Sequence, residues 1–380
     1  MTHDIVIVGA GFAARQLVRS VRRLDPERPI RIVTADSGDE YAKPELSHVF
    51  SKGQSADDLI QQSAADFASA NRCTLHAHTC VNAIDAEQRH IDTDAGTFDY
   101  GELVLATGGQ AIVPPVLGHE RLLTFNSRQE YALSEARLRA AEHVMVLGAG
   151  LVGTELAMDL ARAGKRVTLV DQATTLLPTV LPPLFGGPLQ HALHTLGVSL
   201  HLNATLLSVL PDRNGLRAML STGTSVTVDE VICAVGLRPD TRLAASAGAE
   251  VRQGIVVDDQ LATSVPHLHA LGDAAEIGGR LWPFLQPIQL SAATLARVLT
   301  GDDSAHLMLP PMLVRVKTPT FPIQAAGDPF HPDVRWRISA DADGMTAEGR
   351  TKDGTLLAFL CFDKHTANAI ALLKQLPRLR

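Results

Sequence analysis

The chain has 380 residues, of which 46% are hydrophobic and 20% charged, with a formal net charge of −7 at pH 7. This length exceeds what one ordinary core holds, so two or three domains are expected. The acidic balance argues against general nucleic-acid binding, which needs a basic face. The apolar runs are only strand-length, so no membrane span is expected. Because MTHD leads directly into the first strand without a leader, we expect a cytoplasmic protein.

The first predicted elements form a β–α–β unit. A strand over residues 4–8 leads into a glycine-rich turn at 9–11 and a helix that ends near Leu24. Apolar residues at roughly helical spacing indicate that helix, and IRIVTAD (30–36) is the next strand. A polar loop with helical stretches follows to about residue 70. A β-rich segment then runs to Val116 and includes a strand in the region 100–109.

A second complete unit of the same kind begins near His143. A strand, a glycine-rich turn at 148–153, a helix ending near residue 163 and a strand over 166–171 follow one another. Gly164 stands where glycine commonly ends a helix. Turn-rich segments continue to about residue 239.

From about residue 247 the pattern returns to the style of the first region, with a helix predicted over 290–299. A proline-dotted stretch then spans 310–332. The final residues predict a small α+β module, with strands near 334–339 and 355–361 and a helix from about 364 to 376.

The two glycine-rich turns predict two dinucleotide sites. In the pattern G-x-G-x-x-G/A the first glycine allows a tight turn, the second lets the backbone approach a pyrophosphate, and the third position is small so that helix and strand can pack. The phosphate lies at the helix N-terminus. The residues that fill these positions are Gly9, Gly11 and Ala14 in the first turn and Gly148, Gly150 and Gly153 in the second.

Each turn is followed by an acidic residue at the end of the next strand, Asp36 in the first unit and Asp171 in the second. Such a carboxylate binds ribose hydroxyls. Asp171 would repel a 2′-phosphate, and the residues after it, QATT, include no arginine to bind one. We therefore expect NADH to be preferred over NADPH. Two dinucleotides in one chain suggest a hydride donor in one site and an acceptor in the other.

The nested order resembles that of the two-dinucleotide flavoprotein reductases, in which a first domain is interrupted by a complete second one. LVLATG and HALGDAAE are similar to two further FAD-domain signatures of that family. The resemblance implies an α/β fold with two Rossmann-like domains in a glutathione-reductase-like layout and a small α+β C-terminal domain. The expected boundaries are 1–116 with 247–314 for FAD, 117–246 for NAD, and 315–380 for the C-terminal domain.

The cysteines exclude the thiol chemistry of some branches of this family. The loop EYAKPELSHVFSKG (40–53), where a redox cysteine would stand, contains none. Sulfenic-acid chemistry and a thiol relay are therefore excluded at that position. None of the four cysteines forms a C-x-x-C pair, so we expect no zinc or iron–sulfur site.

Several motifs make the likeness more specific. YxKPxLS near residue 41, LGAGLVGTELA, GLRPxT and VKTP at 316–319 resemble the rubredoxin reductases. GFAARQLV, DEYAKPELSHV, NSRQEY and PFLQPIQLSA are most similar to the flavorubredoxin reductases of bacterial anaerobic nitric oxide detoxification. This resemblance covers essentially the whole chain. ALGDAAE departs from it, since relatives often have a cysteine after the aspartate.

The resemblance assigns roles to individual residues. Lys43 would lie at the reactive edge of the flavin, paired with Glu155, and Asp273 would hold the ribityl chain. Val81 and Leu285 would act through backbone groups. The implied FAD contacts are Gly9, Gly11, Phe12, Ala13, Ala14, Thr34, Asp36, Lys43, Val81, Glu155, Asp273, Leu285 and Lys317. The implied NAD contacts are Gly148, Gly150, Leu151, Val152, Gly153, Asp171 and Gly236.

The resemblance also implies the reaction. NADH would give a hydride to FAD, which would pass electrons singly to a rubredoxin-type iron centre, most simply the rubredoxin domain of a flavorubredoxin that reduces nitric oxide. A ferredoxin reductase that feeds an oxygenase shares the fold and differs in the acceptor. An NADH oxidase is disfavoured by the missing cysteine. An NADH-sensing flavoprotein that signals by changing partners stays open. No nucleic acid or membrane partner is expected.

Overall fold

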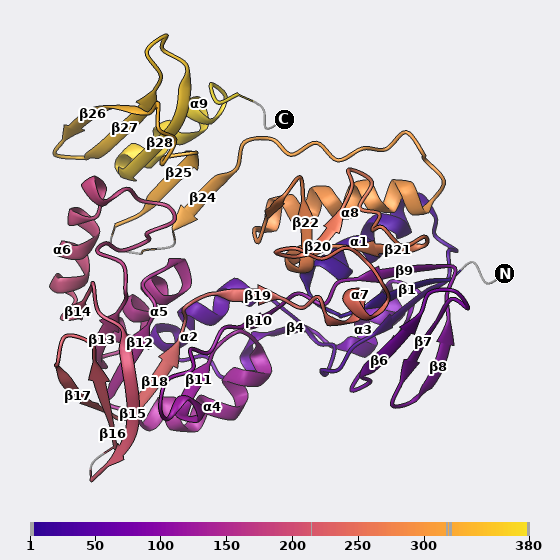
Figure 1. The fold of residues 1–380 in the computed structure, drawn as a ribbon, viewed down its shortest axis with the longest axis horizontal. Coiled ribbons are helices and arrows are strands. Elements are labelled where there is room, and N and C mark those ends of the chain that lie inside the picture. The colour runs from indigo at the N-terminus through magenta and orange to yellow at the C-terminus, as the bar shows by residue number, and fades with distance from the viewer. Residues whose placement is uncertain (1–3, 214, 317, 319–320, 378–380) are drawn as a thin grey trace. The chain divides into compact units, whose positions relative to one another are not determined.

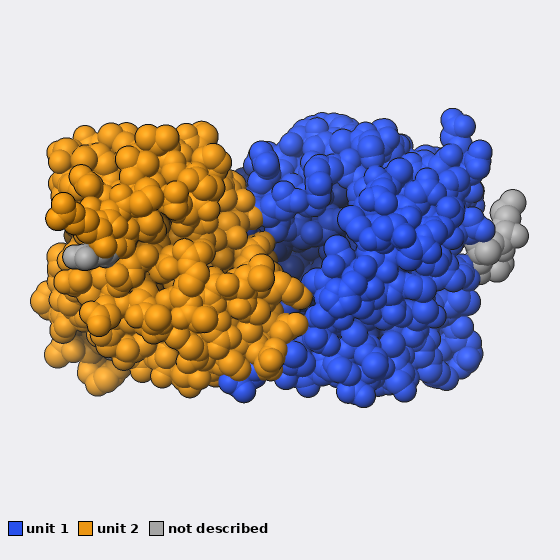
Figure 2. Space-filling view, turned by 90° about the horizontal axis from the view of Figure 1, so that it is seen from below, with its two compact units in different colours: residues 1–42, 58–110, 237–309 blue, residues 43–57, 111–236, 310–380 orange. Residues whose placement is uncertain are grey.

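The computed structural model describes residues 4–213, 215–316, 318 and 321–377. The chain folds into two compact units, shown in blue and orange in Figure 2. Unit 1 consists of Met1–Ala42, Asp58–Gln110 and Leu237–Leu309. Unit 2 consists of Lys43–Asp57, Ala111–Gly236 and Pro310–Arg380. The predicted boundaries of the cofactor domains stay a prediction.

Unit 1 is built on a five-stranded parallel sheet whose strands lie in the order β21–β9–β1–β2–β5. Figure 1 labels β21, β9 and β1 of this sheet. The central strand IVIV is buried along its whole length, as is typical of parallel strands covered on both faces. Helices α1 (Phe12–Leu24) and α8 (Leu285–Leu299) pack against each other. The strands of this sheet are β1 (Ile5–Val8), β2 (Ile30–Val33), β5 (Thr74–His76), β9 (Glu102–Leu105) and β21 (Leu268–Ala270).

Smaller elements complete unit 1. The antiparallel sheets are β6 (Val81–Asp85), β7 (His90–Thr93) and β8 (Gly96–Asp99), together with β3 (Glu40–Tyr41) and β4 (Ile60–Gln62). A mixed sheet contains β20 (Ile255–Val257), β22 (Ala275–Ile277) and β23 (Arg280–Leu281); the remaining helices are α3 (Ala64–Ala70) and α7 (Arg242–Ser246). Helix α8 begins earlier than the predicted residue 290. The prediction missed its first turn because Pro287 reads as a breaker, but proline is tolerated in the first turn.

Unit 2 repeats the arrangement with a parallel sheet ordered β11–β18–β12–β13–β14. Its central strand HVMVL is again fully buried. The strands are β11 (Leu122–Thr124), β12 (His143–Leu147), β13 (Arg166–Val170), β14 (Ser199–His201) and β18 (Glu230–Cys233). The helices are α2 (Val49–Lys52), α4 (Arg128–Ala140), α5 (Leu151–Arg162) and α6 (Gly187–Thr195). An antiparallel sheet follows, with β15 (Leu206–Asp212), β16 (Gly215–Leu220) and β17 (Ser225–Val228). The short strands β10 (Gly109–Ala111) and β19 (Leu237–Pro239), whose residues belong to unit 1 apart from Ala111, pair with each other.

The C-terminal part of unit 2 is a five-stranded antiparallel sheet in the order β24–β25–β28–β27–β26. Its strands are β24 (Leu313–Val316), β25 (Ile323–Gly327), β26 (Arg335–Asp341), β27 (Gly344–Arg350) and β28 (Leu356–Asp363). Two strands, β24 and β25, thus lie in the proline-dotted stretch, to which the sequence analysis assigned no element. The prolines there flank the strands, so they leave the ladder hydrogen bonds intact.

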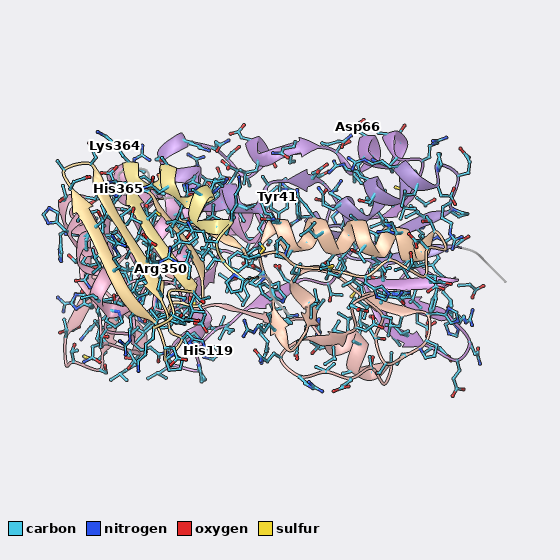
Figure 3. The ribbon with its side chains drawn as sticks, turned by 90° about the horizontal axis from the view of Figure 1, so that it is seen from above. Tyr41, Asp66, His119, Arg350, Lys364 and His365 are labelled. Carbon is cyan, nitrogen blue, oxygen red and sulfur yellow. The ribbon has the colours of Figure 1, made fainter. Side chains whose placement is uncertain are left out.

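The predicted final helix over 364–376 is wrong in its first part. Residues Lys364–Asn368 form a 3-10 helix, and only α9 (Ala369–Leu373) is α-helical. Figure 3 labels Lys364 and His365 beside the C-terminal sheet. The Lys364 Nζ lies 2.6 Å from Asp343 Oδ1, and His365 Nε2 lies 3.0 Å from Asp341 Oδ1. These contacts hold the segment against the β26–β27 hairpin. The hydrophobic pattern of the sequence does not reveal such contacts.

No helix in the described part of the chain is long and apolar enough to cross a membrane. The cytoplasmic location stays a prediction. All four cysteines are free. Burial raises the pKa of the Cys361 thiol to about 11 and also raises the pKa of Cys233, so neither favours the reactive thiolate at neutral pH.

Candidate functional site

The first glycine-rich turn joins β1 to α1 in a conformation that requires glycine. Gly9 has φ +106°, and a Cβ there would lie 2.3 Å from the Ala106 carbonyl oxygen. Its N–H donates to the Val33 carbonyl at 2.8 Å, which fixes the turn at the end of the parallel strands. A Cβ on Gly11 would meet nothing within 4 Å. The start of α1 therefore has open space in front of its free N–H groups, as a phosphate site needs.

Asp36 lies just beyond β2 and is held by its own loop. Its Oδ1 accepts hydrogen bonds from Thr34 Oγ1 at 2.9 Å and from the Gly38 N–H at 2.8 Å. Thr34 is buried and Asp36 is half-buried. The predicted pair of FAD residues is therefore in direct contact, with the carboxylate partly committed to ordering the loop.

Asp273 reaches the same region of unit 1 from the other end of the chain. It lies in the 3-10 helix Gly272–Ala274, just after β21. Gly272 has φ +80°, and a Cβ there would be only 2.7 Å from the Ala13 Cβ. This close approach brings Asp273 beside the first turn of α1. Val81 and Leu285 lie at the first positions of β6 and α8, and Leu285 is 47% exposed.

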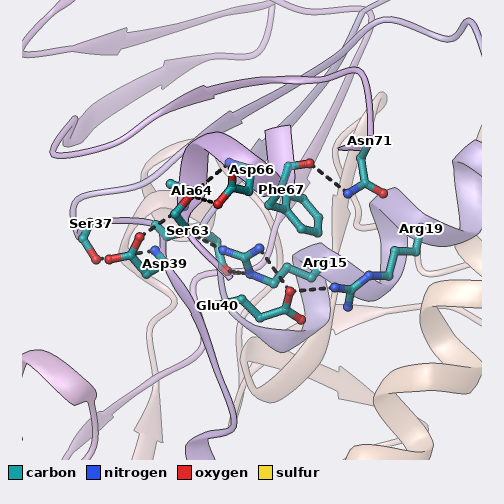
Figure 4. A network of polar contacts seen from close by, with 12 residues as sticks. Arg15, Arg19, Ser37, Asp39, Glu40, Ser63, Ala64, Asp66, Phe67 and Asn71 are labelled. Atoms are coloured by element: carbon teal, nitrogen blue, oxygen red, sulfur yellow. Dashed lines mark hydrogen bonds and ion pairs between the residues drawn. The ribbon is translucent and has the colours of Figure 1, made fainter. Parts of the chain in front are cut away.

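Arg15 is a residue that sequence reasoning missed. Its side chain is only 2% exposed, and its Nε donates to the Ala10 carbonyl at 3.0 Å within the glycine turn. The guanidinium also donates to the Gly38 carbonyl and lies 4.2 Å from the centre of the Phe67 ring (Figure 4). Burial lowers the pKa of Arg15, while Glu40 at 3.6 Å opposes that effect. Arg15 thus ties the turn to the Asp36 loop. An arginine on the apolar face of a predicted amphipathic helix is the feature of the sequence that could have indicated this buried contact.

The second glycine-rich turn joins β12 to α5. Gly148 has φ +107°, and a Cβ there would lie 2.4 Å from the Ala234 carbonyl oxygen. A Cβ on Gly153 would lie 1.9 Å from the Gly148 carbonyl oxygen, whereas one on Gly150 meets nothing within 4 Å. The helix start is again open. Leu151 and Val152 are the first residues of α5, and Val152 is 52% exposed.

Asp171 braces this second turn directly. Its Oδ2 accepts from the Ala149 N–H at 2.5 Å, and its Oδ1 accepts from the Ala173 N–H at 2.7 Å. Gly236, at φ +125°, follows β18, and its carbonyl accepts from the Ile112 N–H at 3.0 Å. The predicted NAD residues thus surround one strand–turn–helix junction and the end of the strand beside it.

Lys43 and Glu155 both belong to unit 2, on elements that pack together. Lys43 begins the 3-10 helix Lys43–His48, which lies against α5. Ser47 Oγ donates to Glu155 Oε2 at 2.9 Å. Lys317, predicted to contact FAD, lies outside the described residues. The predicted pair therefore comes from adjoining segments, and Ser47 is a direct partner of the glutamate that the sequence did not reveal.

A second acid on α5, Asp159, fixes this packing. It is 2% exposed, and it accepts hydrogen bonds from the Phe50 N–H at 2.7 Å and from the Ser51 N–H at 3.3 Å, both at the start of α2. Glu155 and Asp159 are four residues apart, so they lie on one face of the helix. Two acids with this spacing on a largely buried helix could have indicated from the sequence that a second element packs against that face.

Comparison with known proteins settles the class. Residues 3–294 match the family model described as pyridine nucleotide-disulphide oxidoreductase. The chain belongs to the pyridine nucleotide-disulphide oxidoreductase family. Residues 306–376 also match the model for a rubredoxin binding C-terminal domain. This second match coincides with the five-stranded C-terminal sheet and α9.

Relatives of this family resemble the chain from end to end. A protein of Pectobacterium atrosepticum named nitric oxide reductase FlRd-NAD(+) reductase is 53% identical over 376 residues, which cover 99% of both chains. A protein of the same name from Escherichia coli O139:H28 is 48% identical over 377 residues, covering 99% of this chain and all of the relative. The likeness to flavorubredoxin reductases that the sequence motifs indicated is confirmed.

Solved structures of similar fold confirm the fold class. The ferredoxin reductase for the CYP199A2 system from Rhodopseudomonas palustris superposes with a TM-score of 0.88 at 24% identity, over 99% of this chain and 96% of its own. A water-forming NADH oxidase from Lactobacillus brevis, bound to NADH, gives 0.88 at 17% identity, over 98% and 91% of the two chains. The predicted fold class, two Rossmann-like regions with a small C-terminal domain, is confirmed.

Proposed function

We propose that this chain is an NADH-dependent FAD flavoprotein that passes electrons one at a time to the rubredoxin domain of a flavorubredoxin, which reduces nitric oxide. The observation that supports this most strongly is the combination of two open glycine-rich turns with a C-terminal region that matches a rubredoxin-binding model. The full-length relatives carry a name with the same activity.

The residues of unit 1 fit FAD. Open space in front of Gly11 leaves room for a pyrophosphate against the N–H groups of α1. Asp36 would accept hydrogen bonds from the ribose, and Asp273, held beside Ala13, would accept them from the ribityl chain. FAD, when bound, accepts a two-electron hydride and releases single electrons, which a nicotinamide cannot do. The further contacts proposed there are Gly9, Phe12, Ala14, Thr34, Val81 and Leu285.

The second turn fits NADH. The helix start at Gly150 would bind the pyrophosphate, and Asp171 would bind the adenosine ribose. Each oxygen of Asp171 already accepts one backbone hydrogen bond, which leaves a further lone pair on each for ribose hydroxyls. The 2′-phosphate of NADPH would place like charges together there. Leu151, Val152, Gly153 and Gly236 complete the proposed contacts.

Lys43 and Glu155 would work by placement and charge. Neither has to act as a nucleophile, since hydride transfer needs only an aligned donor and acceptor. Lys43→Ala should slow cofactor reduction by NADH or shift the flavin potential, measured by stopped-flow absorbance and by spectroelectrochemistry. Lys52→Ala, which removes an exposed lysine nearby on α2, is the matched control. If both quantities stay unchanged in Lys43→Ala, Lys43 has no role at the cofactor.

The decisive experiment measures NADH oxidation by the purified yellow protein, with and without a rubredoxin domain, while oxygen uptake is recorded. Strong stimulation by rubredoxin with little oxygen consumed is expected. Equal oxidation without rubredoxin, with matching oxygen loss, would identify an oxidase instead. Slow reduction with a long-lived NAD complex and no turnover would favour a sensor, and turnover with a ferredoxin alone would favour a ferredoxin reductase.

A further inference from the structure

A cavity of about 490 Å³ opens in unit 2 close to Glu155. Its lining includes His48, Ser51 and Lys52 from the segment after Lys43, Arg162 from the end of α5, and Thr318. Lys52 and Arg162 are exposed, so the cavity is continuous with solvent. The role proposed above for the Lys43–Glu155 pair does not use this cavity.

His48 lines the cavity and also lies close to Glu155. Its Nε2 is buried and has no hydrogen-bond partner among the described residues. That nitrogen lies 3.9 Å from Glu155 Oε2, and the two side chains are only 14% and 12% exposed. A buried ring nitrogen without a partner is costly, so its position beside a carboxylate needs an explanation.

The neighbouring groups hold these two side chains in place. Ser47 Oγ donates to the same Glu155 oxygen, which fixes the carboxylate beside His48. Asp159, the next acid along α5, is committed to the backbone and hydroxyl of Ser51 and to the Phe50 N–H. Lys52 pairs with Glu45 at the surface. Glu155 is therefore the acid that faces the His48 ring.

The proposed reaction produces a proton that must leave the site. Oxidation of one NADH by two one-electron acceptors yields NAD⁺, two reduced acceptors and one proton. The hydrogen enters as part of a hydride. After two electrons have left singly, it remains as a proton, so each turnover needs a proton acceptor with access to water.

We propose that His48 is the proton relay from Glu155 to the cavity. Glu155 takes up the proton, its O–H bond breaks as His48 Nε2 accepts, and the other ring nitrogen releases a proton to water in the cavity. The ring is then left with its proton on Nε2, and rotation of the ring or proton exchange with water in the cavity restores the starting tautomer. Glu155 is again a carboxylate. A small rotation of the side chain or one bridging water closes the 3.9 Å gap. The proposal rests on the proposed function for the source of the proton.

The kinetic test replaces the ring by a side chain of similar reach that does not titrate. His48→Gln should slow steady-state turnover with rubredoxin about 10-fold or more, because a positioned acid–base group contributes at least that much. Added imidazole should restore part of the rate, and the solvent deuterium isotope effect should rise. His191→Gln, an exposed histidine on α6 in the same unit, is the control and should leave the rate unchanged.

A second measurement tests the contact without turnover. In ¹⁵N-histidine-labelled protein, the ring signals of His48 should move when Glu155 is replaced by Gln, whereas those of His191 should not. If the His48 signals ignore Glu155→Gln, or if His48→Gln keeps its rate and imidazole has no effect, the relay is wrong. If wild-type protein fails to turn over with rubredoxin while the His48 signals respond, the proposed function fails and the His48–Glu155 contact stands.

Discussion

The two glycine-rich turns have nearly the same backbone but are stabilised differently. Gly9 and Gly148 have φ +106° and +107°, and each donates its N–H to the neighbouring strand at 2.8 Å. The residues before each helix, Gly11 and Gly150, have almost equal dihedral angles, at φ −71° and −73°. Repetition of the motif therefore reproduces the local fold to within a few degrees.

The difference lies in what braces each turn. In unit 1 the Ala10 carbonyl is held by Arg15, and Asp36 is occupied with its own loop. In unit 2 the Asp171 carboxylate itself holds the Ala149 N–H, and Thr154 makes only a 3.2 Å bond to the Ala149 carbonyl. The same motif thus depends on the buried Arg15 side chain in one unit and on the Asp171 carboxylate in the other. Matched substitutions should have unequal effects.

Substitutions at the third position of the glycine motif, Gly153 in unit 2 and Ala14 in unit 1, should give the largest difference in stability between the two turns. Gly153→Ala would place a Cβ 1.9 Å from the Gly148 carbonyl oxygen, a backbone atom that cannot move without opening the turn. We expect a loss of about 3 kcal/mol or more in stability, in line with overpacking of a tight site. NADH affinity should fall at least about 10-fold, measured by quenching of protein fluorescence.

The reciprocal change in unit 1 is the control. Ala14→Gly removes a buried methyl group from a position where alanine is already accommodated, at a cost of about 1 kcal/mol in helix propensity. FAD content should stay normal in both variants. If Gly153→Ala binds NADH normally, the close approach of α5 to its turn is not required for the site.

Removing each brace should give the next largest contrast. Arg15→Met deletes the donor to the Ala10 and Gly38 carbonyls and should cost about 3 kcal/mol, with visible loss of FAD on gel filtration. Thr154→Val should cost about 1 kcal/mol, because the Ala149 carbonyl also accepts from the Leu177 N–H at 2.8 Å. Urea unfolding gives both values. Equal costs would show that Arg15 is not the brace of the first turn.

The turns were predictable from the sequence because their chemistry is local. Glycine spacing, a preceding apolar strand and an acid after the next strand all lie within a short stretch of chain, and the structure reproduces them at Gly9 and Gly148. The braces were not predictable, because Arg15 reaches Gly38 and Asp159 reaches Phe50 across the fold. Such contacts depend on how helices and loops pack against one another, and the hydrophobic periodicity of the sequence does not determine that packing.

The C-terminal region shows the same limit. The final helix has an acceptable apolar pattern, but Lys364 and His365 bind acids of the neighbouring hairpin and keep that segment in a tighter turn.

Two further points lie outside that region. The start of α8 was missed because a proline such as Pro287 normally ends a helix unless it lies in the first turn. The role of Lys43 beside Glu155 came from family resemblance alone and stays a prediction.

The smallest predicted contrast concerns acid. In unit 1, Glu102 lies 2.9 Å from both His267 Nδ1 and His269 Nε2, between strands β9 and β21. Burial alone would raise the pKa of Glu102, but the hydrogen bonds to His269 and His267 outweigh it and lower the pKa. When the pKa of a carboxyl is lower in the folded than in the unfolded state, its charge stabilises the fold at any pH above the unfolded-state pKa. This stabilisation is lost as the pH falls through the folded-state pKa.

Unit 2 carries no such histidine pair at its described sheet strands. There the Glu230 carboxylate accepts hydrogen bonds from Nε and Nη2 of Arg137, at 2.8 and 2.7 Å. We therefore expect Glu102→Gln to cost unit 1 about 1 kcal/mol near neutral pH. This cost should shrink as the pH falls through the lowered pKa of the folded state, because the wild-type carboxyl then becomes protonated as well. Urea midpoints across this pH range, with fluorescence of bound FAD reporting on unit 1, measure the difference. A cost that stays constant into acid would mean that the negative charge of Glu102 does not stabilise unit 1, because the protonated wild-type carboxyl would then differ from glutamine as much as the carboxylate does.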